Sequence, residues 1–256
     1  MKKLFILFLV LGSFFNGSSQ SFNFTREDSL RGTITKEREW WDLRFYHLDI
    51  EVHPERKFIE GSVAIHYSVI HPYQTLQIDM QTPLTVTKVL QDDEELTFQK
   101  EGRNVYMVSL TKSQEQGTTQ SIKVFYEGVP LEAKNPPWEG GLQWATTLEG
   151  KPFIATSCQG LGASVWWPCK DHLSDKPDSM RITVTVPQGL SDISNGRLLR
   201  KTEMPGGQMR FEWYVSYPIT PYCVVMNIGN YSHFSEEYIS ENDTLTLNYY
   251  CMPHDQ

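Results

Sequence analysis

Hydrophobic and polar residues alternate with a period of two along much of the chain, which is the pattern of β-strands with one buried face. The alternation is clearest from Leu43 to Val52 and again from Phe58 to Tyr67. Between these runs, the sequence His-Pro-Glu-Arg at 53–56 indicates a turn. The two runs are therefore expected to pair as an antiparallel hairpin.

Eleven further runs follow at short intervals and are separated by Pro, Gly and acidic turns. These runs are 75–79, 84–90, 96–99, 105–110, 121–126, 152–157, 180–186, 197–203, 208–215, 222–228 and 244–251. Residues 128–150 carry several prolines and glycines, and we expect an irregular loop there. Thr25 and Thr35 are candidate N-caps of short helical turns. The pattern predicts an all-β fold of saddle-shaped or sandwich-like antiparallel sheets with few helical turns.

The first residues have a different pattern. Lys2 and Lys3 precede an apolar run at 4–15, which is too short to span a bilayer, and small and polar residues follow. We interpret residues 1–20 as a signal peptide, with an uncleaved anchor as the alternative. We expect a lead-in segment at 21–41, a β-domain at 42–253, a periplasmic or extracellular location, and no membrane association after cleavage.

Charge and motifs exclude several functions. The formal net charge is −8 and the chain has no Lys/Arg cluster, which argues against nucleic acid and anionic membrane surfaces as partners. None of the seven histidines lies in an H-E-x-x-H motif or in a pair spaced i, i+4. His66 and His71 leave open a metal site built on strands, but no further ligand pattern supports it. We therefore expect that the chain binds no metal and holds no catalytic residue of its own.

Four cysteines stand at 158, 169, 223 and 251, without a C-x-x-C spacing. Free buried thiols and disulfides both remain open after export. If one bridge forms, we expect it between Cys223 and Cys251, because both lie in runs that are expected to be strands.

The segment 157–171 departs from the surrounding alternation, with two adjacent tryptophans, a proline, two cysteines and one amide. The amide, Gln159, can accept a hydrogen bond from an ammonium group and stay neutral. Gly160 and Gly162 would let a ligand approach the backbone. On chemistry alone, an amide that satisfies loop backbone groups is the more frequent arrangement.

Several stretches in order resemble one protein family. TSCQGLGASVWWPCKD resembles a segment in the N-terminal domain of the aminopeptidase N and leukotriene hydrolase family of zinc metallopeptidases, particularly its bacterial exported branch. TKEREWWDLRFYHLDIEVHPERKFIEGSVAIHY, LQIDM, IKVFYEG and SYPITPYCVVMNIGNYS are similar to other family stretches. The resemblance covers residues 40–252. It implies a β-saddle that packs against a thermolysin-like zinc domain.

The resemblance also implies roles for single residues. Gln159 matches the position that binds the free α-amino group of the substrate, and Gly160 would line the pocket for the first substrate side chain. The resemblance also implies that a structural corner is formed by Trp166, Trp167, Pro168 and Asp171. The chain departs from the family pattern at Ser164, where arginine is frequent, and at 170–172, where Lys-Asp-His replaces an acidic-proline ending.

The family's G-x-M-E-N and H-E-x-x-H motifs and its transition-state tyrosine belong to the next domain and are not in this sequence. The resemblance therefore predicts the substrate-facing domain of an exported zinc aminopeptidase. The expected partners are the N-terminus of a peptide and a zinc catalytic domain in cis, with the Zn2+ ligands outside this chain. The alternative is a stand-alone secreted β-sandwich module that binds peptide or glycan without catalysis.

Overall fold

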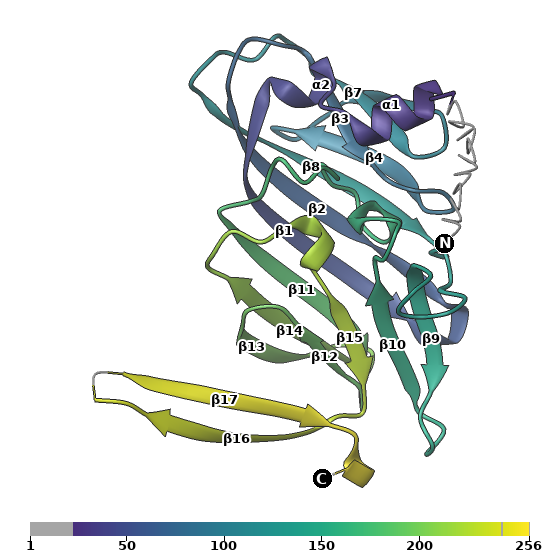
Figure 1. Ribbon diagram of the computed structural model, residues 1–256, viewed down its shortest axis with the longest axis vertical. Helices are drawn as coiled ribbons and strands as arrows, with labels where there is room; N and C mark the ends of the chain where they lie inside the picture. The colour runs from purple at the N-terminus through teal and green to yellow at the C-terminus, as the bar shows by residue number, and fades with distance from the viewer. Residues whose placement is uncertain (1–22, 242, 256) are drawn as a thin grey trace, which may run out of the picture.

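The computed structural model describes residues 23–241 and 243–255 (Figure 1). The expected signal peptide at 1–20 lies outside the described residues. Among the residues described, no helix is long and apolar enough to cross a membrane.

The largest sheet has eight strands in the order β13-β14-β11-β1-β2-β8-β4-β5. Its strands are β1 (Trp41–His53), β2 (Phe58–Val69), β4 (Thr85–Gln91), β5 (Glu94–Glu95), β8 (Thr119–Gly128), β11 (Ser179–Pro187), β13 (Arg197–Met204) and β14 (Gln208–Val215). The expected antiparallel hairpin of β1 and β2 is confirmed. One neighbouring pair departs from the antiparallel expectation, because β1 and β11 run parallel.

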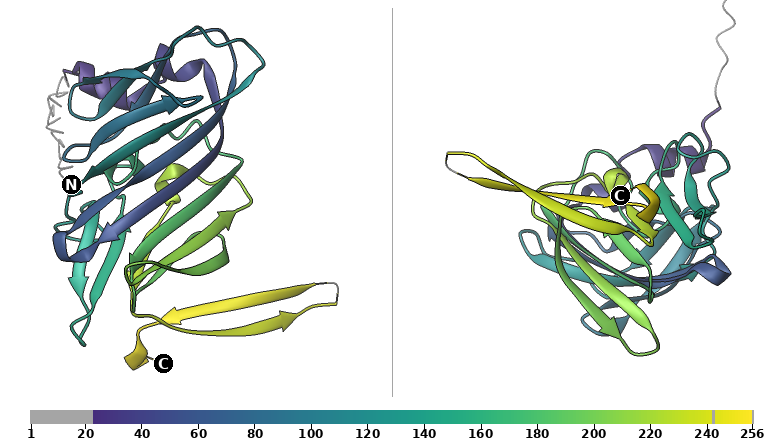
Figure 2. Two further views of the ribbon diagram at one scale, coloured as in Figure 1. Left: turned by 180° about the vertical axis from the view of Figure 1, so that it is seen from behind. Right: turned by 90° about the horizontal axis from the view of Figure 1, so that it is seen from below.

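Three smaller sheets complete the fold. A four-stranded sheet has the order β12 (Ser191–Ser194), β15 (Met226–Gly229), β10 (Pro152–Ser157) and β9 (Gly141–Thr146). A three-stranded sheet contains β3 (Thr75–Asp79), β7 (Val105–Ser109) and β6 (Thr97–Glu101). The last two strands, β16 (Ser232–Ile239) and β17 (Thr244–Cys251), form a hairpin that extends away from the body (Figures 1 and 2). The all-β, multi-sheet prediction is confirmed.

Four strands were not expected, and one expected strand is wrong in part. The two-residue strand β5 lies where an acidic turn is expected. β9 lies inside the predicted irregular stretch 128–150, where it pairs along its whole length with β10. β12 and β16 lacked a distinctive pattern. The expected strand 222–228 is split into a 3-10 turn η3 (Pro221–Cys223) and the short strand β15, because Pro221 begins the turn.

Two short helices precede β1. α1 (Arg26–Gly32) has the expected N-cap, since Thr25 Oγ1 accepts from the Asp28 backbone N–H in a capping box. α2 (Lys36–Glu39) begins after Thr35, whose side chain makes no cap bond. The Thr35 hydroxyl instead donates to Gln77 Oε1 of β3 at 2.7 Å, which attaches the lead-in segment to the three-stranded sheet.

The core is one apolar cluster that joins the sheets, and four tryptophans in it are fully buried: Trp40, Trp41, Trp166 and Trp167. The ring of Trp167 meets Tyr46 of β1 edge to face, with ring centroids 4.8 Å apart. The core therefore connects the lead-in segment and the 157–171 segment to the centre of the largest sheet.

No Cys223–Cys251 disulfide, the pairing favoured if a bridge forms, is present in this structure, where all four cysteines are free. Cys223 lies in the 3-10 turn η3 rather than in a strand. Cys251 lies at the end of β17, opposite Ser232 of β16. The expectation depended on two strand positions, and only one of them is a strand.

Candidate functional site

Gln159 lies in a tight turn that follows β10. The backbone N–H groups of Leu161 and Gly162 both donate to the Cys158 carbonyl, at 3.0 and 2.9 Å. Gly160 and Gly162 have φ values of 72° and 83°, in the left-handed region that favours glycine. A Cβ at Gly162 would also overlap the Asp171 carboxylate. The turn therefore requires glycine at 162, and it leaves Gln159 exposed to solvent.

Among the described residues, the side chain of Gln159 has one hydrogen-bond partner, a residue of η3. The hydroxyl of Tyr222 donates to Gln159 Oε1 at 2.9 Å. Tyr222 is itself 39% exposed, so both ends of this bond face solvent. Tyr222 is not recognisable from the sequence, because the two residues are 63 positions apart and nothing in the local pattern relates them.

Asp171 caps the 3-10 turn η2 (Ala163–Val165) that follows the Gln159 turn. Its carboxylate accepts from the backbone N–H groups of Ala163 and Ser164, at 3.3 and 3.0 Å, and from the Ser164 hydroxyl at 2.6 Å. The N–H of Asp171 donates to the buried carboxylate of Asp79 in β3 at 2.9 Å. Asp171 thus connects the turn to the three-stranded sheet.

The corner residues Trp166, Trp167 and Pro168 are buried beneath this turn. Lys170, which departs from the family pattern, is also buried: its ammonium donates to Asp175 Oδ2 at 2.5 Å and to the Trp41 carbonyl at 2.7 Å. Burial lowers the pKa of Lys170, while the Asp175 carboxylate opposes that shift. Lys170 thus adds an internal ion pair with Asp175 to this segment.

A second set of polar contacts fixes the turn from the lead-in side. Arg31 of α1 donates to the carbonyls of Gly160 and Leu161, at 3.1 and 2.6 Å. The Gln81 amide donates to the same Leu161 carbonyl at 2.5 Å. Behind them, Arg38 forms a buried ion pair with Asp79. Arg31 stands 129 positions before Gly160, so its contact with this turn is not recognisable from the sequence either.

A hollow of about 610 Å3 lies beside Gly160. Three of its residues are large, apolar or aromatic and solvent-exposed: Phe24, Leu173 and Tyr222. Asp28, Arg31 and His172 add polar groups to its wall. A Cβ at Gly160 would meet no atom within 4 Å, so the absence of a side chain there keeps the wall open.

The two nearby thiols are unsuited to nucleophilic chemistry. Burial raises the pKa of Cys158 to about 12 and that of Cys169 well above its ordinary value. His172, the histidine that follows Cys169 in the sequence, contacts the Ser174 hydroxyl through Nδ1 at 2.9 Å. The buried thiols therefore act as apolar core groups.

The family model for the peptidase M1 N-terminal domain matches residues 44–223. The chain belongs to the M1 peptidase family. The match includes the Gln159 turn, the corner below it and Tyr222. No curated protein matches the sequence significantly.

This M1 N-terminal domain is similar in fold to solved M1 structures. A variant of the M1 zinc metallopeptidase from Deinococcus radiodurans matches with a TM-score of 0.71 and 18% identity, over 85% of this chain and 49% of that one. A variant of that enzyme bound to a Tyr-Ser-Ala substrate matches with a TM-score of 0.70 and 19% identity, over 85% of this chain and 49% of that one. Native yeast LTA4 hydrolase matches with a TM-score of 0.60 and 22% identity, over 81% of this chain and 31% of that one. The chain thus spans about half the length of the Deinococcus structures, and these identities show the fold alone.

Proposed function

We propose that this domain is the substrate-facing N-terminal domain of an exported zinc aminopeptidase, and that Gln159 binds the free α-amino group of the peptide substrate. Family membership supports the enzyme class. The apolar run after Lys2 and Lys3 supports export to the periplasm or beyond.

The observation that carries the Gln159 assignment is an exposed amide on an otherwise fixed turn. The backbone around Gln159 is held by Arg31, Gln81 and Asp171, while its side chain reaches solvent. Its Oε1 has two lone pairs, and the Tyr222 hydroxyl occupies one of them. The second is free to accept a charge-assisted hydrogen bond from a peptide ammonium. A neutral amide does this without a change of charge.

The hollow beside Gly160 supports a place for the first substrate side chain. Its apolar walls, Phe24 and Leu173, are 82% and 73% exposed. Exposed apolar groups around a polar anchor are also what a face covered by a second domain would present. They favour an assembled enzyme over a stand-alone binding module.

The residues of this chain do not fit a catalytic zinc of the family type, because the sequence lacks an H-E-x-x-H motif. Peptide-bond hydrolysis itself is therefore assigned to the catalytic domain of the parent protein. This domain orients the substrate amino terminus, and it derives its effect on rate from that positioning.

The decisive experiment is a Gln159→Ala substitution in the protein that carries this domain together with its catalytic domain. We expect kcat/KM for peptides with a free amino terminus to fall about 30-fold, which corresponds to roughly 2 kcal/mol for a lost charge-assisted bond. The matched control is Gln188→Ala, because Gln188 is an exposed glutamine away from the turn.

Unchanged kcat/KM in Gln159→Ala would remove the assignment of Gln159. Failure of the parent protein to release N-terminal residues from any peptide would remove the aminopeptidase assignment as well, and would favour the binding-module alternative.

A further inference from the structure

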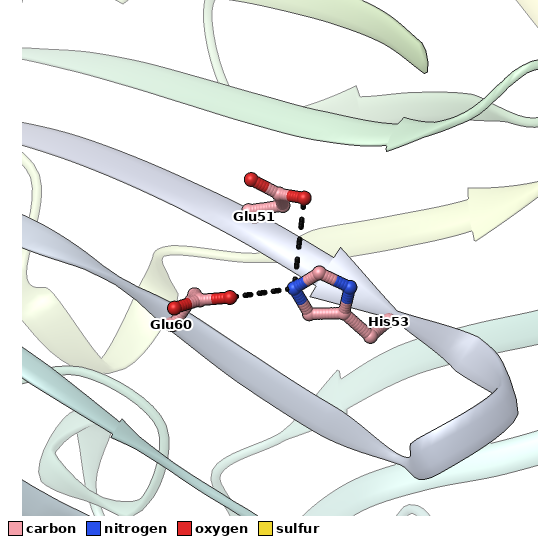
Figure 3. Close-up of side chains that lie close together, drawn as sticks. All are labelled: Glu51, His53 and Glu60. Atoms are coloured by element: carbon pink, nitrogen blue, oxygen red, sulfur yellow. Dashed lines mark hydrogen bonds and ion pairs between the residues drawn. The ribbon is translucent and has the colours of Figure 1, made fainter. Parts of the chain in front are cut away.

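Glu51, His53 and Glu60 converge at the closed end of the β1–β2 hairpin (Figure 3). His53 Nε2 lies 2.8 Å from Glu60 Oε1 and 3.6 Å from Glu51 Oε1. All three ligand-type atoms lie within 4.8 Å of one another. Two carboxylates therefore face a single ring nitrogen from two sides, as Figure 3 shows.

The strand register produces this convergence. Glu51 of β1 and Glu60 of β2 are directly opposite in the antiparallel ladder, and His53 follows Glu51 by two positions, on the same face of the sheet. The 3-10 turn η1 (Pro54–Arg56) closes the hairpin immediately beyond His53. Phe58 packs against the imidazole, with ring centroids 5.9 Å apart. The three donors thus lie on a rigid element and do not depend on a loop.

The electrostatics of the site call for a cation. Glu127 of β8 lies opposite Glu60, so three glutamates stand in one row across neighbouring strands. Like charges directly opposite each other destabilise a sheet. Among the described residues, no lysine or arginine forms an ion pair with Glu51 or Glu60, whose one ionic neighbour within 4 Å is His53.

The basic residues of this region are engaged elsewhere. Arg210 pairs with Asp49 at 2.9 Å, and Lys57 pairs with Glu132 at 2.8 Å. The Gln208 amide donates to Glu51 Oε1 and holds that carboxylate in place, as outer groups do around metal ligands. The acidic pair therefore keeps its charge uncompensated apart from one imidazole.

We propose that Glu51, His53 and Glu60 bind one divalent cation of the Zn2+ type. One imidazole and two carboxylates form a donor set that suits Zn2+, whereas Ca2+ and Mg2+ prefer oxygen ligands alone. Ligand atoms in a tetrahedral zinc site lie about 3.3 Å apart, and the two observed distances from His53 Nε2 lie on either side of that value. A hollow of about 350 Å3 adjoins Glu51 and Glu60, which leaves room for water in the remaining coordination position.

The test is a calorimetric titration of Zn2+ into the whole chain after treatment with a chelator. We expect one Zn2+ per chain with a dissociation constant in the micromolar range. Glu60→Gln and His53→Gln each remove one donor and should weaken binding by tenfold or more. Glu127→Gln is the matched control, because it removes the same charge from the same row of the sheet but lies outside the three-donor cluster.

Three results would overturn the proposal. The first is wild-type affinity no tighter than that of Glu60→Gln. The second is an equal loss in Glu127→Gln, which would show a general effect of negative charge. The third is an affinity for Mg2+ that matches the affinity for Zn2+, which would show that the imidazole is not a ligand. Glu60→Gln keeps the shape of the side chain and leaves the Phe58 contact with His53 intact, so it gives an answer even if His53→Gln fails to fold.

Discussion

The hydroxyl of Tyr222 fixes the orientation of the Gln159 amide. Both side chains are exposed, and each would otherwise sample several rotamers. The bond directs one lone pair of Oε1 toward the tyrosine, so the other lone pair faces a defined direction. In the proposed enzyme, Tyr222 is a positioning residue for the amino-group anchor.

Substituting Tyr222→Phe removes this bond and keeps the ring in the wall of the hollow. We expect kcat/KM of the parent enzyme for free amino-terminal peptides to fall about three- to tenfold, the scale of one neutral hydrogen bond. Tyr217→Phe is the control, because Tyr217 is 79% exposed and lies outside the hollow. Equal kinetics in the two variants would show that Gln159 is oriented without Tyr222.

The sequence points to Gln159, the proposed anchor, but not to the residues that hold it. Gln159 and the corner below it stand in one continuous segment with an unusual composition and a family resemblance. Tyr222 and Arg31 reach the same turn from positions 63 and 129 residues away, so only the tertiary fold brings them together. The expected strand position of Cys223 is wrong for a related reason, since Pro221 places Cys223 in a 3-10 turn that strand periodicity does not detect.

At the level of elements, the two short helices act as a brace between β3 and the Gln159 turn. Arg31 of α1 binds the carbonyls of the turn, and Arg38 of α2 reaches the interior to pair with Asp79. Asp79 in turn accepts the Asp171 N–H at 2.9 Å. One buried carboxylate therefore links the lead-in segment to the corner that carries the candidate site.

Replacing Arg38→Met leaves the buried Asp79 carboxylate without its ionic partner. We expect the free energy of unfolding to fall by about 3–5 kcal/mol, because an unpaired buried charge is costly. Urea denaturation measures the change. Arg26→Met is the control: the arginine of its ion pair with Glu101 is 63% exposed, and we expect a much smaller loss of stability there than in Arg38→Met.

A loss in Arg38→Met no larger than that in Arg26→Met would contradict the brace. Adding Asp79→Asn to Arg38→Met should recover part of the loss, since the second change neutralises the orphaned carboxylate.

The strands that the sequence predicts are those with a complete local pattern. The β1–β2 hairpin alternates over its full length with a proline turn between, and the turn and both strands lie where we expect them. β9, β12 and β16 were missed because they are short or solvent-facing, and they exist through their pairing with neighbours. Their local sequence lacks the alternation that would identify them.

At the scale of the whole molecule, a buried carboxylate connects the two larger sheets. Asp192 of β12, in the four-stranded sheet, accepts a hydrogen bond from the indole N–H of Trp213, in β14 of the eight-stranded sheet, at 3.0 Å. Ser194 donates to the same carboxylate, also at 3.0 Å. Burial raises the pKa of Asp192 to about 7, against the opposing effect of these two donors.

This raised pKa makes the junction between the sheets sensitive to pH. The folded state keeps a proton that the unfolded chain releases near its ordinary value of 3.8. The contribution of protonated Asp192 to the free energy of unfolding is therefore complete below pH 3.8, and it is lost as the pH rises through about 7. We expect Asp192→Asn, which mimics the neutral acid, to remove this decline, so that its advantage over wild type grows with pH to the order of a few kcal/mol.

Urea unfolding of wild type and Asp192→Asn at pH 5 and pH 8 measures this difference. Asp178→Asn serves as the control, because its carboxylate is 53% exposed and pairs with Arg44 at the surface. A difference between wild type and Asp192→Asn that is the same at both pH values would show that Asp192 does not titrate with folding.

The parallel pairing of β1 with β11 has a consequence for how the chain reaches its folded state. Phe45 lies beside Ser179, so the central seam of the largest sheet joins segments that are synthesised far apart in time. Until β11 emerges, β1 has one strand edge without its partner, and closing so long a loop slows folding. While the chain is still being synthesised, the unpaired backbone groups of that edge could pair with strands of other chains, which promotes aggregation. Completion of the sheet late in synthesis would therefore be the step at which this domain depends most on protection from chaperones.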